Sequence, residues 1–193
     1  MIWLKICLYA ICAVIFLFAV YEILKNSEYF ASALRGNVPF VSCPRPLRAA
    51  IVRTINAHYG DAKTLCDIGS GYGGLMRHIV RRCPVCATGL ENMPISAVGA
   101  KMMSAITCGG RVRTIWCDAF EYLDGCDGFD IGIAYLGPGV NDKLARYIPK
   151  FRVLIVLDVP IGGVTPTRTI DVGHGHTHYG RKKYPHKLFI YER

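Results

Sequence analysis

The sequence predicts an α/β fold, in which a seven-stranded, mainly parallel sheet ends in an antiparallel hairpin and is preceded by one transmembrane helix. Short apolar runs alternate with amphipathic stretches from about residue 40 onward, as expected of βα units. The last two runs have no helix between them, which favours an antiparallel pair. A long uncharged apolar run near the N-terminus predicts the membrane helix.

Residues 1–24 are predicted to be a transmembrane anchor. They hold two ionisable side chains, Lys5 and Glu22, and the run 6–21 has no charge, Gly or Pro. About 20 mostly apolar residues suffice to cross a bilayer. A cleaved signal peptide is the rival interpretation, although the bulky and charged residues after Val20 offer no small-residue cleavage site. A buried helix of the domain itself is a third.

A polar linker is expected over residues 25–39, followed by one folded domain over residues 40–193. The net charge of +9 lies outside the anchor, because Lys5 and Glu22 cancel within it. Basic residues beside a membrane span attract anionic lipid headgroups, so we expect lipid contact rather than nucleic acid, with a merely solvated basic face as the alternative. The positive-inside rule predicts a single-pass protein whose domain faces the cytoplasm or the mitochondrial matrix.

The domain is expected to begin with a helix and then to alternate strands with helices. The predicted helices are 46–59, 73–82, 94–106 and 140–147. The predicted strands are 64–69, 87–91, 113–117, 130–135 and 152–157, with the terminal hairpin at 168–172 and 187–191.

Nine cysteines, an odd number without framework spacing, argue against a disulfide scaffold and favour a reducing compartment. Cys83 and Cys86 form a single C-x-x-C, and His174, His176 and His178 are the only other ligand cluster. A four-ligand zinc site needs a second pair of ligands near the first. We therefore predict no metal site.

The sharpest local pattern is the run CDIGSGYGG at residues 66–74, where a predicted strand ends and a helix begins. Read through Gly69, Gly71 and Gly74, it matches a dinucleotide-binding turn. Read as D-x-G-x-G, it places the carboxylate of Asp67 beside the turn, which favours a ligand with an ammonium group and repels a pyrophosphate.

Acidic residues also end the next two predicted strands. Glu91 can accept hydrogen bonds from both hydroxyls of a ribose, and Asn92 follows it. Asp118 can accept one from an adenine amino group, with Ala119 and Phe120 against the ring. Since the carboxyl ends of parallel strands share one edge of a sheet, these groups are expected to form one site.

This pattern resembles the class I S-adenosylmethionine-dependent methyltransferases, whose Rossmann-like sheet closes with such a hairpin, over about residues 40–193. The resemblance implies S-adenosylmethionine as cofactor. It also implies a set of contacts from the turn and from the two strand ends: Asp67, Gly69, Ser70, Gly71, Gly73, Glu91, Asn92, Asp118 and Ala119.

Within that superfamily, the membrane span and the runs VPFV at 38–41, YLGP at 135–138 and TP at 165–166 resemble a narrower group. These are the membrane-anchored protein-lysine methyltransferases that act on the ATP synthase c subunit and the adenine nucleotide translocase. The likeness implies a membrane protein as substrate. Two departures are Tyr72, where that group commonly has Asp, and Ser42-Cys43, where it commonly has a Pro-rich continuation.

Methyl transfer to lysine needs alignment, exclusion of water and a neutral amine, but no metal. Tyr135 is predicted to orient the amine and Asp158 to hold its ammonium form on entry. Two alternatives stay open: a nicotinamide-dependent oxidoreductase, and a membrane-anchored binding or assembly module without turnover. The pattern makes no prediction of oligomeric state.

Overall fold

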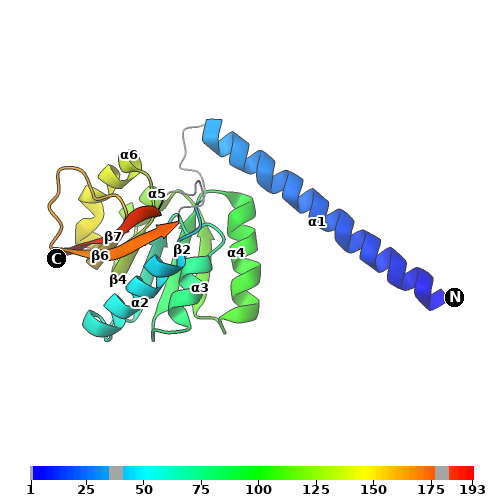
Figure 1. The fold of residues 1–193 in the computed structure, drawn as a ribbon, viewed down its shortest axis with the longest axis horizontal. Coiled ribbons are helices and arrows are strands. Elements are labelled where there is room, and N and C mark those ends of the chain that lie inside the picture. Colours follow the sequence, from blue (N-terminus) through cyan, green and yellow to red (C-terminus); the bar gives the residue numbers. More distant parts are fainter. Residues whose placement is uncertain (1, 35–40, 177–182) are drawn as a thin grey trace. The chain divides into compact units, whose positions relative to one another are not determined.

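Figure 1 shows the computed structural model, which describes residues 2–34, 41–176 and 183–193. The chain divides into two compact units, Met1–Pro39 and Phe40–Arg193. Each is described by itself below.

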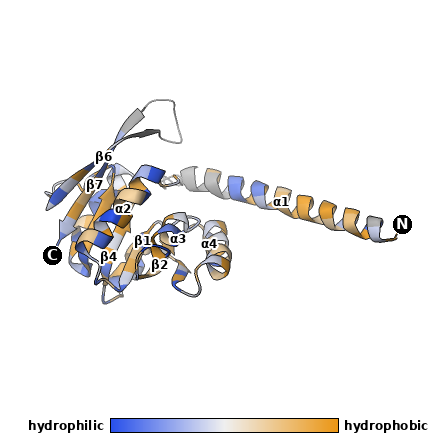
Figure 2. Ribbon diagram, turned by 60° about the horizontal axis from the view of Figure 1, so that its bottom comes forward, coloured by the Kyte–Doolittle hydropathy of each residue, from blue (hydrophilic) through white to orange (hydrophobic). Residues whose placement is uncertain are grey.

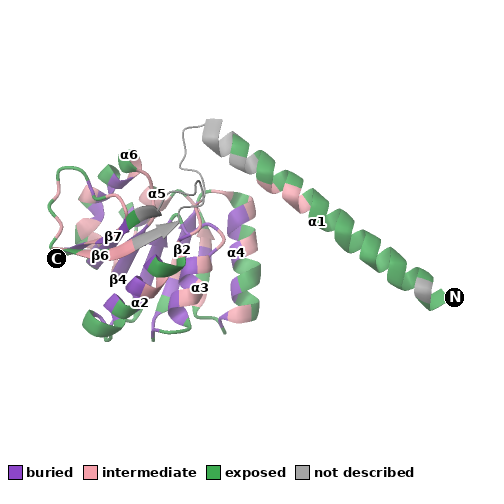
Figure 3. Cartoon of the chain, viewed as in Figure 1, coloured by how far each residue is buried: buried purple, intermediate pink, exposed green. Residues whose placement is uncertain are grey.

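The first unit is the single helix α1, Ile2–Leu34. Within it, Lys5–Ser27 is long and apolar enough to cross a membrane, and the described side chains of this stretch are mostly exposed (Figures 2 and 3). The helix continues through residues 25–34, which were expected in the linker. No Gly or Pro interrupts the sequence before Gly36, and Lys25 forms an i,i+3 ion pair with Glu22.

The second unit contains the expected seven-stranded sheet, which confirms the predicted fold class. The strand order is β3-β2-β1-β4-β5-β7-β6, and β7 runs antiparallel to both of its neighbours while all other pairs are parallel. The strands are β1 Thr64–Ile68, β2 Cys86–Glu91, β3 Val112–Trp116, β4 Phe129–Ala134, β5 Phe151–Leu157, β6 Arg168–His176 and β7 Lys183–Glu192.

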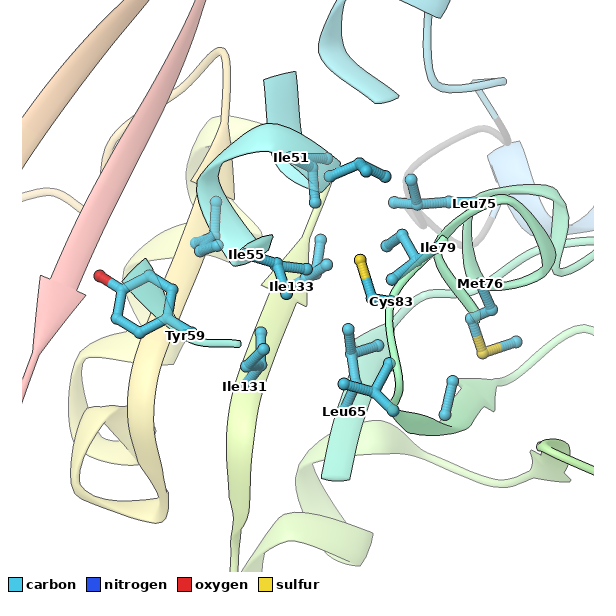
Figure 4. Close-up of a cluster of buried hydrophobic side chains, with 14 of the residues drawn as sticks. Ile51, Ile55, Tyr59, Leu65, Leu75, Met76, Ile79, Cys83, Ile131 and Ile133 are labelled. Atoms are coloured by element: carbon cyan, nitrogen blue, oxygen red, sulfur yellow. The ribbon is translucent and has the colours of Figure 1, made fainter. Parts of the chain in front are cut away.

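Helices cover both faces of this sheet and bury two apolar layers. On one face lie α2 Arg45–His58, α3 Gly74–Val80 and α4 Pro94–Thr107 (Figure 1). In Figure 4, Ile51 and Ile55 of α2 pack towards Ile131 and Ile133 of β4. The other face is covered by α5 Ala119–Asp124, α6 Pro138–Asn141 and the 3₁₀ helix η1 Asp142–Lys150, with Leu123, Leu144 and Tyr147 in its core.

Two elements on this second face differ from the sequence prediction. The helix expected at 140–147 is instead the short α6 followed by η1, which contains Pro149, a residue without the N–H that an α-helix interior needs. Helix α5 was not predicted. It has six residues, and the Asp118 side chain caps its N-terminus by accepting hydrogen bonds from the backbone N–H groups of Phe120 and Glu121.

Candidate functional site

The glycine turn after β1 has a backbone that only glycine adopts easily. Gly69, Gly71 and Gly73 have φ angles of 74°, 52° and 69°, all in the left-handed region. A Cβ at Gly69 would lie 2.7 Å from Cδ2 of Leu136, which follows β4. The turn therefore brings the backbone close to the end of β4 and keeps its surface free of side chains.

Asp67 is a buried carboxyl on β1, 3% exposed. Burial, and secondarily the charge of Glu91, raises its pKa to about 7. Among the described residues no cation forms an ion pair with it. The buried hydroxyl of Ser70, in the turn, also has no hydrogen-bond partner in the described part of the chain. A cationic ligand at the turn would stabilise the Asp67 carboxylate.

Glu91 ends β2 and holds the turn in place. Its Oε2 accepts a hydrogen bond of 2.6 Å from the Gly71 N–H, and its Oε1 accepts one of 2.8 Å from the Met93 N–H. Glu91 is the residue expected to accept hydrogen bonds from the ribose hydroxyls of a cofactor, and it lies at the end of β2 as that expectation requires. Asn92 is exposed beside it, and its carbonyl accepts a hydrogen bond from the Trp116 indole at 3.1 Å.

Asp118 follows β3 and is exposed. Its cap bonds to Phe120 and Glu121, of 2.7 and 3.3 Å, both end on Oδ1. Oδ2 accepts no hydrogen bond from a described residue, so it can accept one from a ligand. Ala119 is the first residue of α5 and is half-buried. The sequence pattern placed Asp118 at this edge but did not reveal its capping role.

Tyr135 and Asp158, the two predicted acceptor-side residues, are in contact. The Tyr135 hydroxyl donates a hydrogen bond of 3.1 Å to Oδ2 of Asp158. Tyr135 follows β4 and Asp158 follows β5, which is the strand next to β4. Asp158 has φ 62° and is the one non-glycine residue with a left-handed backbone in the described part of the chain.

His186 of β7 completes this cluster and was missed by the sequence pattern. Its side chain is fully buried, and its Nδ1 lies 3.0 Å from Oδ2 of Asp158. Because a carboxylate only accepts, Nδ1 carries the hydrogen. The Lys187 N–H donates to Oδ1 of Asp158 at 3.1 Å. His186 Nε2 is buried and finds no partner among the described residues.

The start of α2 lies near both groups of acids. Burial raises the pKa of Cys43 to about 12, and the charges of Asp67 and Asp158 add to this rise. The thiol therefore stays protonated and is no nucleophile. The Arg48 guanidinium donates from Nε to the Cys43 carbonyl at 2.7 Å, which holds this segment. Of the VPFV run at 38–41, residues 38–40 lie outside the described residues.

The two cysteines of the C-x-x-C pair lie in different environments, and neither belongs to a group of metal ligands among the described residues. Cys83 is buried in the core and Cys86 is exposed at the start of β2. No group of three His, Cys, Asp or Glu side chains that could hold a metal ion occurs among the described residues. His174 and His176 lie in β6, and His178 lies outside the described residues.

Several solved structures with a similar fold are methyltransferases. An RNA methyltransferase of Salinibacter ruber, in complex with S-adenosyl-L-homocysteine, has a TM-score of 0.60 and 21% identity, covering 79% of this chain and 93% of its own. A candidate RNA methyltransferase of Pyrococcus horikoshii has a TM-score of 0.63, 11% identity and coverages of 79% and 86%.

A precorrin-6y C5,15-methyltransferase of Geobacter metallireducens has a TM-score of 0.58 and 12% identity, covering 79% of this chain and 92% of its own. No protein-family model matches the chain, and no curated protein sequence matches it. At these identities the likeness shows a methyltransferase-like fold. The named acceptors differ, so the fold alone does not identify a substrate.

Proposed function

We propose that this protein is a membrane-tethered, S-adenosylmethionine-dependent methyltransferase that methylates a lysine of a membrane or membrane-associated protein. The observation that carries the proposal is Asp67, a buried carboxyl without a cationic partner among the described residues, beside a glycine turn. The neighbouring strand β4 leads to Tyr135, and β5 beside it leads to Asp158. An ammonium-bearing cofactor would fit beside Asp67, and an amine acceptor would fit beside Tyr135 and Asp158.

The residues on the cofactor side fit S-adenosylmethionine better than a nicotinamide dinucleotide. Asp67 would face the ammonium group of the cofactor, Glu91 its ribose hydroxyls and Asp118 its adenine amino group. A pyrophosphate at the same turn would be repelled by the negative charge of the Asp67 carboxylate. The S-adenosyl-L-homocysteine bound in the Salinibacter ruber structure supports this choice. When bound, S-adenosylmethionine supplies a sulfonium methyl group for in-line transfer to a nucleophile.

On the acceptor side, a lysine must lose a proton before its nitrogen can attack. The Asp158 carboxylate can attract the ammonium and accept that proton, and Tyr135 can orient the nitrogen lone pair. The new N–C bond then forms as the C–S bond breaks, and S-adenosylhomocysteine leaves. Burial of the lysine stem in the apolar surroundings of Leu136 would lower the pKa of the amine, which favours its neutral form.

The membrane part of the proposal rests on α1. A retained span at Lys5–Ser27 would hold the domain beside embedded substrates and raise their effective concentration. The charge of +9, carried outside the anchor, supports a domain on the cytoplasmic or matrix side.

The test uses the full chain in lipid nanodiscs, with labelled S-adenosylmethionine and a membrane-protein fraction. We expect label on lysine, located by mass spectrometry as steps of one methyl mass, and its loss in Asp158→Asn but not in the exposed control Asp127→Asn. Label on RNA, or calorimetric binding of NAD in place of S-adenosylmethionine, would contradict the proposal. Cofactor binding without label on any macromolecule would favour a module without turnover.

A further inference from the structure

Helix α4 buries small residues against the domain and exposes large apolar residues to solvent, the reverse of an ordinary surface helix. The buried residues are small: Ser96, Ala97, Ala100 and Ser104. The residues at i, i+4 and i+8 on the solvent side are large and apolar: Val98, Met102 and Ile106 are 55%, 64% and 81% exposed. A helix that packs only against its own sheet places its large apolar residues inward. This side of α4 is therefore built for contact with something else.

The same apolar surface continues onto the neighbouring edge strand. Trp116 of β3 is 62% exposed, and its indole N–H is held by the Asn92 carbonyl at 3.1 Å. A groove of about 610 Å³ at this edge is lined by residues of α4 and β3, including Lys101, Arg113 and Trp116. Figures 1 and 3 show α4 at the border of the domain, with exposed residues along its length.

The charge of this region has one sign. Residues 93–117 contain Lys101, Arg111 and Arg113 but no Asp or Glu. The acid before this segment, Glu91, is buried and bonded to backbone N–H groups. Aliphatic side chains, an anchored indole and exposed cations together match an anionic lipid surface, where Trp and basic residues lie at the headgroup level.

We propose that this lipid-facing edge, formed by Val98, Lys101, Met102, Ile106, Arg113 and Trp116, rests on an anionic membrane surface. The inference goes beyond the proposed function and does not depend on methyl transfer. Two other partners fit less well. A second copy docked by twofold symmetry would bring the same cations together, and RNA would leave the exposed aliphatic stripe without a role.

Helix α1 of the same chain can place the domain beside a membrane. Residues 35–40 are all that separate α1 from the described part of the domain, so a tether of six residues keeps the domain within reach of the bilayer that α1 can cross. Weak contacts are sufficient under such a tether, because the effective concentration of lipid is high.

The test uses the full chain with Trp3→Phe, which leaves Trp116 as the sole tryptophan. The protein is placed in nanodiscs of phosphatidylcholine, with or without phosphatidylglycerol, that contain brominated lipid. Bromine quenches tryptophan only at short range. We expect quenching of Trp116 to be at least about twofold greater with the anionic lipid. Equal, negligible quenching in both lipids would overturn the proposal.

Charge reversal provides the matched comparison. Lys101→Glu with Arg113→Glu should abolish the anionic-lipid increment, whereas Arg53→Glu, at an exposed position on α2, should leave it intact. The circular dichroism spectrum shows whether each variant is folded. Loss of the increment in Arg53→Glu as well would mean nonspecific attraction and would overturn the proposal. So would cross-linked dimers through Trp116→Cys, or protection of Trp116 by RNA, in place of lipid quenching.

Discussion

The two sides of the candidate site are held in different ways. On the cofactor side, Asp67 lies in β1, Glu91 ends β2 and Asp118 follows β3, and the carboxylates of Glu91 and Asp118 accept hydrogen bonds from backbone N–H groups. On the acceptor side, Tyr135, Asp158 and His186 meet through their side chains, across 23 and 28 residues of sequence. Hydrogen bonds from the backbone hold the first side, and contacts between side chains hold the second.

This difference means that the two sides should be separable by substitution. A change on the cofactor side should alter binding of S-adenosylmethionine, because those groups are proposed to contact it. A change on the acceptor side should alter turnover and leave cofactor affinity intact. The first two predictions test this separation directly.

The largest effect is expected for Glu91→Ala. The variant loses the proposed contacts to ribose and the two hydrogen bonds from the Gly71 and Met93 N–H groups, and charged hydrogen bonds contribute about 1.5–3 kcal/mol each. We expect cofactor affinity to fall at least about 100-fold in calorimetry. The exposed Asp127→Ala should bind like the parent chain. Normal affinity in Glu91→Ala would remove Glu91 from the site.

The next effect is expected for Asp158→Asn, which keeps the shape and loses the charge. We expect kcat to fall about 100-fold, the lower end of the usual range for loss of one acid–base group, with cofactor affinity changed by less than about twofold. Steady-state kinetics and calorimetry on the same preparation measure the two quantities. A parallel loss of both would mean that the two sides act as one unit.

The third prediction concerns pH. The pKa of Asp67 is raised to about 7 in the ligand-free protein, so the carboxyl keeps its proton below that pH. A cationic ligand favours the carboxylate, and its binding must therefore release a proton. We expect affinity to rise about tenfold from pH 6 to pH 8 and to level off above. In Asp67→Asn this rise should disappear.

The smallest effect is expected where the two sides touch. Gly69→Ala puts a Cβ 2.7 Å from Leu136 on a left-handed backbone, whereas Gly163→Ala, at φ 72°, meets nothing within 4 Å. The backbone cost of about 1–2 kcal/mol is common to both. The thermal midpoint should fall about 3–6 °C in Gly163→Ala and further in Gly69→Ala. Equal falls of the thermal midpoint in the two variants would mean that the Leu136 side chain moves aside at no cost in stability.

The sequence predicted the glycine turn and the strand-end positions of Glu91 and Asp118 because this information is local. A strand, a glycine turn and an acid lie within a few residues of one another at CDIGSGYGG, and the parallel order of strands then aligns Glu91 and Asp118 with them. Helix α5 escaped prediction because six residues give too little apolar periodicity, although Asp118 is itself a typical N-cap.

His186 could not be found in the same way. It has no neighbouring motif, and it reaches Asp158 only because β7 inserts between β5 and β6. An antiparallel hairpin was predicted, but not which of its strands pairs with β5. The lipid-facing edge was missed for a related reason: the apolar residues of α4 have helical periodicity whichever side faces the sheet.

The left-handed backbone at Asp158 has a consequence for protein engineering. Glycine, asparagine and aspartate are the residues that occupy this conformation readily. Random mutagenesis of this codon should therefore yield few well-folded alternatives, and of those three residues only aspartate carries the negative charge. Attempts to retune acceptor preference have more freedom at Tyr135, which contributes a hydroxyl from an unstrained backbone.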